Sequence, residues 1–212
     1  MTYHYRAAIA QKNWPVVIRF IKSGDIHVDT CTCGDSGNTA LMSASSQNGT
    51  ASVVISLIGL GADIDKTNNH GANALSLAAG YNMDGANVRI LLNRGADLVP
   101  RCGRPAIIIA SEYNNTHAVR AMLDYGVYYH TIDTSNPRAR ETPLDFACHE
   151  GNTDICRLLL DAGADPLIKN GNGKTPYDTA MYHGNIHIDK TGVRQLMTDA
   201  IEKHAAVPPT VA

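Results

Sequence analysis

A short pattern that returns at a nearly constant spacing is the feature that most constrains the fold of this 212-residue chain. Its fullest copy occupies residues 142–165, beginning with Thr142-Pro143-Leu144 and ending with Gly163-Ala164-Asp165. Glycines that close the successive copies are separated by 37, 34, 31 and 37 residues, and they are Gly24, Gly61, Gly95, Gly126 and Gly163. A period of this length predicts an array of stacked units, each of which packs only on its neighbours.

Each unit is predicted to form two helices joined by a turn. In the fullest copy, Thr142 can cap a helix N-terminus, and Pro143 suits the first turn, where its missing N–H costs nothing. Gly151 can turn the chain between antiparallel helices, and Leu159 supplies the apolar face of the second helix. Gly163 can then end that helix in the left-handed conformation.

This combination of a period near 33 residues, a helix–turn–helix and the two flanking triplets resembles the ankyrin repeat family. The resemblance covers about residues 5–185. It implies an all-α ankyrin-repeat solenoid of stacked helix–turn–helix units joined by β-hairpin-like loops. We expect a single ankyrin repeat domain over residues 1–206 and a short C-terminal tail over 207–212, with units at about 4–34, 35–67, 68–100, 101–134, 138–170 and 171–206.

Several positions depart from the family's pattern. The fourth unit is eroded, because Pro105-Ala106-Ile107 replaces the capped helix start. The histidine usual after the leucine is absent, and Asp145 and Asp178 stand there in two units, where we expect them to interact with the helix dipole. Terminal units of such arrays carry polar outer faces, and the residues expected to provide them are Gln11, Lys12, Arg19, Lys190, Arg194, Glu202 and Lys203.

Composition excludes several classes of function. The formal net charge is −2 and the sequence pI is about 6.5, which argues against general affinity for nucleic acid or for a membrane surface. No apolar stretch approaches the roughly 20 residues of a membrane helix. The five cysteines are odd in number and imply no disulfide framework, and no signal peptide is recognised. We therefore expect a soluble, cytoplasmic protein that is monomeric on its own.

The resemblance implies binding through two surfaces, the concave face of the first helices and the tips of the hairpin loops. Tyrosine offers a large contact area at low entropic cost, and arginine recognises carboxylates with two parallel hydrogen bonds. Aligning the units on the fifth copy places such residues on both surfaces. The candidate binding residues are Tyr81, Arg101, Arg104, Glu112, Tyr113, Arg138, Arg140, His149, Glu150, Tyr182 and His183.

We accordingly expect a non-enzymatic scaffold that binds one partner protein, with the arginines favouring an acidic surface on that partner. No cofactor is expected. Two alternatives remain within the same class: an immunity or inhibitor protein that neutralises a toxin, and a pathogen effector.

An enzyme subunit and a metal-stabilised module are the remaining hypotheses. Cys148 and His149 are consecutive, so they point about 100° apart on a helix and are poorly placed as a nucleophile and its base. Cys31 and Cys33 could offer two thiolates to zinc, but a structural zinc site needs four ligands, and none stands at a recognisable spacing. The sequence therefore predicts no catalytic residue and no metal ligand.

Overall fold

The computed structural model describes residues 2–31, 36–100, 104–127, 140–181 and 190–205. Over these ranges the chain forms helices and no strand. The helices are α1 (Thr2–Ala10), α2 (Trp14–Lys22), α3 (Ala40–Ser45), α4 (Ala51–Gly59), α5 (Ala74–Tyr81), α6 (Ala86–Asn93), α7 (Ala106–Glu112), α8 (Thr116–Asp124), α9 (Pro143–Glu150), α10 (Thr153–Asp161), α11 (Pro176–Met181) and α12 (Thr191–Ala205).

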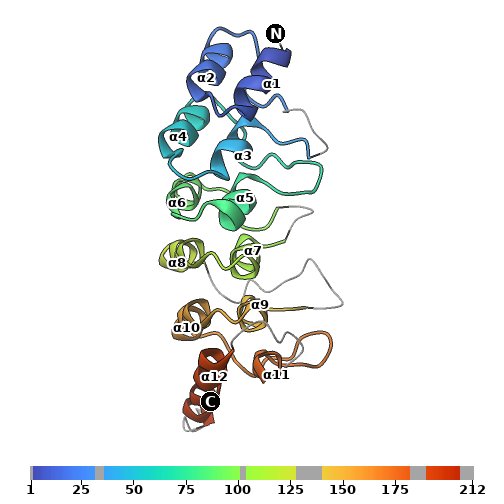
Figure 1. Ribbon diagram of the computed structural model, residues 1–212, viewed down its shortest axis with the longest axis vertical. Helices are drawn as coiled ribbons and strands as arrows, with labels where there is room; N and C mark the ends of the chain where they lie inside the picture. The colour runs from blue at the N-terminus through green and yellow to red at the C-terminus, as the bar shows by residue number, and fades with distance from the viewer. Residues whose placement is uncertain (1, 32–35, 101–103, 128–139, 182–189, 206–212) are drawn as a thin grey trace.

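Successive helices pair, and the pairs stack into two parallel columns (Figure 1). Odd-numbered helices form one column, in which α3 packs on α5, α5 on α7, and α7 on α9. Even-numbered helices form the other column, and the loops between pairs project from the odd-numbered side (Figure 1). The predicted all-α solenoid is thus confirmed.

Local signals explain where the helices begin. The Thr142 hydroxyl accepts a bond from the Asp145 backbone N–H at 3.1 Å, and the Asp145 carboxylate accepts one from the Thr142 backbone N–H at 2.7 Å. This reciprocal capping box satisfies two backbone donors at once. Thr39 caps α3 by accepting a hydrogen bond from the Met42 backbone N–H. Asn73 caps α5 by accepting one from the Ser76 backbone N–H. Pro105 precedes α7 without a side-chain cap, as the eroded fourth copy predicts.

Left-handed residues end the helices and turn the chain. Gly163, the closing glycine of the fullest copy, has φ of 101°, and Gly151 between α9 and α10 has φ of 72°. At the matching turns after α1 and α7 the left-handed position is held by Lys12 and Asn114, with φ of 57° and 56°. A side chain in this conformation is strained because its Cβ crowds the following carbonyl.

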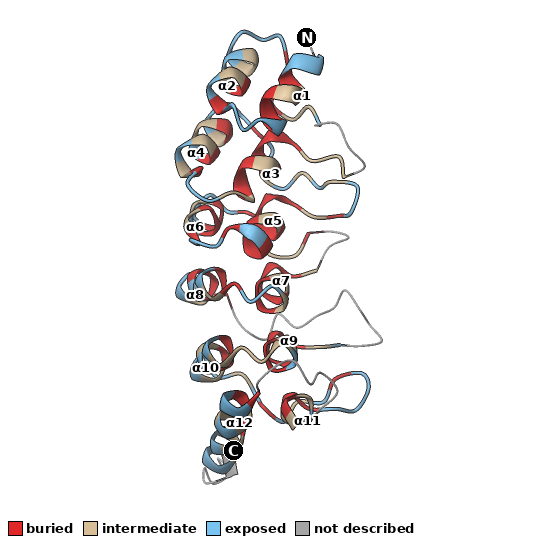
Figure 2. Ribbon diagram, in the orientation of Figure 1, coloured by how far each residue is buried: buried red, intermediate tan, exposed pale blue. Residues whose placement is uncertain are grey.

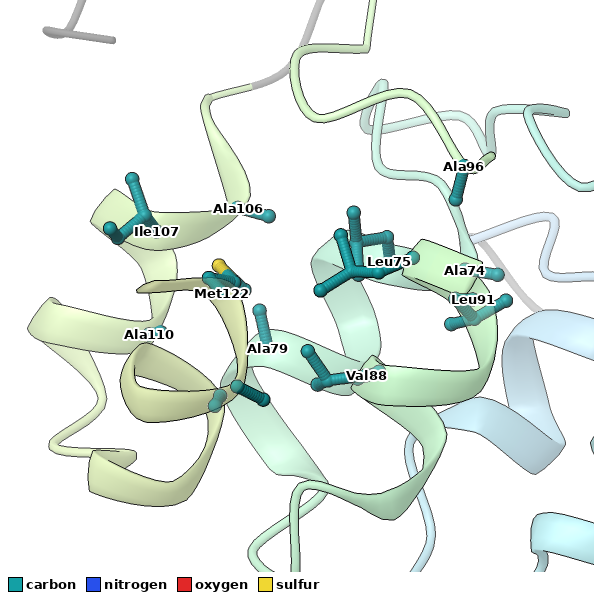
Figure 3. Packing of buried hydrophobic residues seen from close by; sticks show 14 of the residues in the cluster. Ala74, Leu75, Ala79, Val88, Leu91, Ala96, Ala106, Ile107, Ala110 and Met122 are labelled. Carbon is teal, nitrogen blue, oxygen red and sulfur yellow. The ribbon is translucent and has the colours of Figure 1, made fainter. Parts of the chain in front are cut away.

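One continuous apolar core runs along the stack between the two columns (Figure 2). Leu75, Leu91, Ile107 and Met122 are almost completely buried, and Figure 3 shows them in the part of the core built by α5 to α8. Ala79 and Ala110, which Figure 3 also labels, are fully buried, and their small side chains allow neighbouring helices to pack closely. No single pair could bury these faces alone, so stacking stabilises each pair.

Buried asparagines tie neighbouring pairs together. The amide nitrogen of Asn87, which is fully buried on α6, donates to the backbone carbonyl oxygens of Ser45 at 3.1 Å and Gln47 at 2.8 Å. Asn115, before α8, donates to the carbonyl oxygens of Ala79 at 2.8 Å and Asn82 at 3.0 Å. These bonds satisfy carbonyl groups left over at the ends of α3 and α5, so each helix end is completed by the next pair.

Most of the expected polar cap residues are exposed, but Arg194 is half-buried and Lys190 is buried. Arg19 near one end and Glu202 and Lys203 near the other are exposed. Lys190 was expected on the outer face and is instead buried, with 3% of its surface exposed. Its ammonium group lies 3.5 Å from the carbonyl oxygen of Thr179, because the start of α12 folds back against α11. The sequence from His130 to Arg140 also predicts a loop longer than the other hairpins, and of these residues only Arg140 is among the described ones.

Candidate functional site

Two exposed tyrosines form a pair on the odd-numbered column. Tyr81 is the last residue of α5, and Tyr113 follows α7 directly, so the stacking of the two helices brings the rings together. The ring centroids lie 5.2 Å apart with the planes at 69°, an edge-to-face contact. Each residue keeps about half of its surface exposed, 51% for Tyr81 and 46% for Tyr113. Large exposed aromatics held in one place are well suited to contact a partner.

A glycine makes this close approach of the helices feasible. A Cβ added at Gly80 would lie 3.3 Å from the Cγ2 atom of Ile109 and 3.8 Å from the ring of Tyr113. The absence of a side chain therefore gives Ile109 room to pack against α5, and the Tyr113 ring lies beside the same glycine at a van der Waals distance. The hydroxyl oxygens of Tyr81 and Tyr113 are 3.5 Å apart, which is long for a hydrogen bond. The edge-to-face contact of the two rings therefore dominates the interaction. The neighbouring Tyr81 hydroxyl nonetheless raises the pKa of the Tyr113 hydroxyl above its usual value of 10.0.

The tyrosine pair borders a groove of about 490 Å³, which we call the tyrosine groove. Leu77 and Ile109 give it an apolar wall, and Ser76 also lines it, although its hydroxyl oxygen is buried. The full lining is Asn68, His70, Ala72, Ser76, Leu77, Tyr81, Arg104, Ile109, Glu112 and Tyr113.

Arg104 and Glu112 form an ion pair in this groove. The Arg104 Nη1 and Glu112 Oε2 atoms are 2.5 Å apart, and each side chain is 34% exposed. The guanidinium carbon of Arg104 also lies 4.7 Å from the centre of the Phe146 ring on α9, in a cation–π contact. Arg104 is therefore held in place and its charge is balanced within the chain, which weakens its expected role in attracting an acidic partner.

The other candidate residues are placed as follows. His149 and Glu150 at the end of α9 are paired, with Nδ1 and Oε1 2.9 Å apart, and His149 is 55% exposed. Arg140 is exposed and has φ of 45°. Four candidates, Arg101, Arg138, Tyr182 and His183, lie outside the described residues. The structure thus brings Tyr81, Arg104, Glu112 and Tyr113 into one groove.

The geometry does not support a catalytic cysteine. Cys148 is fully buried, and its Sγ atom lies 3.8 Å from that of Cys156, also buried. The contact with Cys156, together with burial, raises the pKa of the Cys148 thiol well above its usual value. A neutral, enclosed thiol is a poor nucleophile, and His149 bonds to Glu150 at the surface instead.

No metal-binding cluster is found in the part of the chain that the structure describes. Within it, no three His, Cys, Asp or Glu side chains come close enough together to hold an ion. Cys31 is exposed, and Cys33, its expected companion, is not among the described residues. Of the helices described, none is long and apolar enough to cross a membrane.

Sequence reasoning missed Ser76, Leu77, Ile109 and Phe146 as parts of the site. Leu77, Ile109 and Phe146 occupy the same position in three successive first helices and are only partly buried. The same alignment that selected the tyrosines could have found this stripe. An unpartnered Ser76 hydroxyl has no sequence signal, because it depends on packing.

Helix pairs stacked in this way define a helical-repeat solenoid. Comparison with known families makes this specific: a family model for ankyrin repeats, in three copies, matches residues 5–101 and 88–170. The chain belongs to the ankyrin repeat family.

Known relatives share parts of the chain. It is 33% identical over 109 residues to ankyrin repeat and SOCS box protein 11 of Danio rerio, covering 50% of this chain and 35% of that protein. Over 149 residues it is 31% identical to the putative palmitoyltransferase ZDHHC13 of Danio rerio, covering 69% of this chain and 22% of that protein. Over 110 residues it is 33% identical to the nuclear factor NF-kappa-B p105 subunit of Mus musculus, covering 50% of this chain and 11% of that protein. Since the chain spans about a third or less of these relatives, the likeness concerns the repeats.

Proposed function

We propose that this chain is a non-enzymatic scaffold that binds a partner protein through the odd-numbered column, with the tyrosine groove as the centre of the contact. Ankyrin repeats generally mediate protein–protein interaction, and the family match covers most of the chain. The observation that carries the proposal is the exposed pair of Tyr81 and Tyr113 at the rim of a groove. Aromatic anchors beside a pocket commonly provide most of the energy of an interface.

Preorganisation supports the same conclusion. Tyr113 is held against Gly80, and Arg104 is held by Glu112 and Phe146, so these side chains lose little conformational entropy on binding. Loops adjacent to the groove, including His70, extend the contact surface toward the hairpin tips. Cys148 and Cys156 are free thiols 3.8 Å apart, which fits the reducing cytoplasm as the site of action.

The test is a comparative capture experiment. The immobilised protein is exposed to a lysate of its native source, and bound proteins are quantified by mass spectrometry. We expect at least one protein to be captured by the wild type and to be depleted more than tenfold by Tyr81→Ala with Tyr113→Ala. Tyr125→Ala is the matched control, because Tyr125 is a tyrosine with the same exposure, 51%, at the end of α8 in the other column. If the double variant captures the same proteins as the control, the groove is not the binding site.

A further inference from the structure

A second groove, of about 580 Å³, lies between α1 and α3 at the N-terminal end of the odd-numbered column, and we call it the N-terminal groove. Its walls include Tyr3, Arg6 and Lys12 from the first helix pair. Ser43, Ser46 and Gln47 line it from α3 and the turn that follows. No carboxylate side chain lines the groove among the described residues.

The charges of this groove are not balanced within the described part of the chain. Neither Arg6 nor Lys12 makes an ion pair there, and the Arg6 Nε atom is buried without a hydrogen-bond partner. Arg104 in the tyrosine groove differs, because its guanidinium group is paired with the Glu112 carboxylate. An anionic ligand would balance these two positive charges, and a guanidinium group binds a carboxylate through charge-assisted hydrogen bonds.

The polar wall opposite the cations is held in a fixed arrangement. The Ser46 hydroxyl and the Gln47 amide nitrogen both donate to the Ser43 carbonyl oxygen, at 3.1 and 2.8 Å. These bonds fix the two side chains at the C-terminal end of α3. Hydroxyl and amide groups of this kind can bond to the backbone of an extended peptide while the cations bind its acidic side chains.

Lys12 occupies a turn position whose left-handed backbone conformation favours glycine. At the matching turns after α3 and α9 the left-handed position is occupied by Gly49 and Gly151, with φ of 73° and 72°. Lys12 adopts φ of 57° there, and its exposed side chain lines the groove. A strained residue that persists at a functional surface is consistent with a role in binding.

We propose that the N-terminal groove binds an acidic segment, a run of Asp or Glu side chains, of the partner protein. Arg6 would bind a carboxylate through its planar guanidinium, and Lys12 would attract the segment as a point charge. The proposal rests on the proposed function in assigning the groove to the same column, but it uses different residues. It also moves the expected acidic contact from the loop arginines to the first helix pair.

The two grooves are two helix pairs apart. At an interaxial distance of about 10 Å per pair, that is roughly 20 Å, and an extended chain covers it in about six residues. A partner segment with acidic residues about six positions away from an apolar or aromatic residue would therefore reach both grooves.

The probe for the test is a fluorescein-labelled hexaglutamate peptide, whose binding is followed by fluorescence anisotropy at low ionic strength. We expect Arg6→Gln with Lys12→Gln to weaken its binding at least tenfold. Arg19→Gln with Lys22→Gln is the matched control, because both residues are exposed on α2 and the change in net charge, from −2 to −4, is the same. The control should weaken binding less than twofold. Equal losses in the two variants would overturn the proposal, since they would show that overall charge alone governs binding.

Three further measurements make every outcome decisive. Backbone amide shifts of the wild type on addition of hexaglutamate should concentrate at Ser43, Ser46 and Gln47, and shifts centred elsewhere would contradict the proposal without any variant. Inorganic phosphate should compete only at concentrations far above that of the peptide, and equally tight phosphate binding would show a small-anion site instead. Tyr81→Ala with Tyr113→Ala should leave hexaglutamate affinity unchanged. A negative lysate capture would thus count against the tyrosine groove alone, and a negative hexaglutamate assay would count against the N-terminal groove alone.

Discussion

Asp145 should make the stability of this protein fall as the pH rises from 4 to 7. Its carboxylate is buried, with 3% of the residue exposed, and its Oδ1 atom has no partner among the described residues. Burial raises the pKa of Asp145 from the ordinary value of 3.8 to about 6, although hydrogen bonds from the Thr142 N–H and hydroxyl oppose the shift. The folded protein therefore holds a proton that the unfolded chain releases.

The size of the effect follows from this difference in pKa. Each pKa unit corresponds to about 1.36 kcal/mol, so moving from 3.8 to about 6 costs the folded state about 3 kcal/mol once Asp145 is ionised. Below pH 3.8 the group is protonated in both states and no penalty exists. Between pH 4 and 6 the folded state binds more protons, so the free energy of unfolding decreases as the pH rises, and above pH 6 the full penalty is present.

The assay compares urea unfolding of the wild type and Asp145→Asn from pH 4 to pH 7, followed by circular dichroism. Asparagine keeps an acceptor for the Thr142 N–H but does not ionise. The difference in unfolding free energy between variant and wild type should therefore grow by about 2 to 3 kcal/mol in favour of the variant across this range. Other carboxylates affect both proteins equally and cancel.

Asp178 is an internal control in the same motif. It bonds to Thr175 as Asp145 bonds to Thr142, but it is exposed, and the bonds from Thr175 lower its pKa below 3.8. Its contribution to stability is present above pH 3.8 and is lost as the pH falls through its folded pKa. Asp178→Asn should therefore lose stability at neutral pH, opposite in sign to Asp145→Asn. Parallel pH profiles for the wild type and Asp145→Asn would refute the argument that burial governs this carboxylate.

Three further variants test the packing. Asn87→Ala should lower the free energy of unfolding in urea by about 2 to 4 kcal/mol, because it leaves buried carbonyls at the end of α3 without a donor. Lys12→Gly should raise the melting temperature, with a gain of about 0.5 to 1 kcal/mol from relief of the left-handed strain, whereas Gln11→Gly at the adjacent position should lower it. Arg104→Ala should cost about 1 kcal/mol or less in urea unfolding, because its ion pair with Glu112 is a third exposed and is partly screened by solvent, and a larger loss would mean that the Phe146 contact dominates.

The fold was predictable because its signals are local. Thr142, Gly151 and Gly163 each specify the conformation of their own backbone, and the near-regular recurrence of such residues predicts stacking. The tyrosine pair was predictable in part, because aligned positions in successive pairs become neighbours. Lys190 could not be placed, since its burial depends on how α12 folds back on α11.

The groove chemistry was the least predictable part. Arg104 reads as a free cation in the sequence, and only the structure shows it bonded to Glu112 and stacked on Phe146, which is 42 residues away. Arg6, by contrast, reads as an ordinary surface residue, yet its Nε atom is enclosed without a partner in the described structure. Whether a charge is balanced depends on contacts between units, which a repeat pattern does not specify.

The asparagine bridges give the stack a direction. Asn87 completes the end of α3, and Asn115 completes the end of α5, so in both cases a later segment satisfies backbone groups of an earlier one. During synthesis the earlier helix pair leaves the ribosome first, and its helix end waits in water until the following pair arrives. A chain cut off after α5 would keep every apolar residue of its earlier pairs and still lack the amide that Asn115 supplies. Each helix pair therefore depends on the pair that follows it in the chain, and a nascent or truncated chain would be least stable at its C-terminal end.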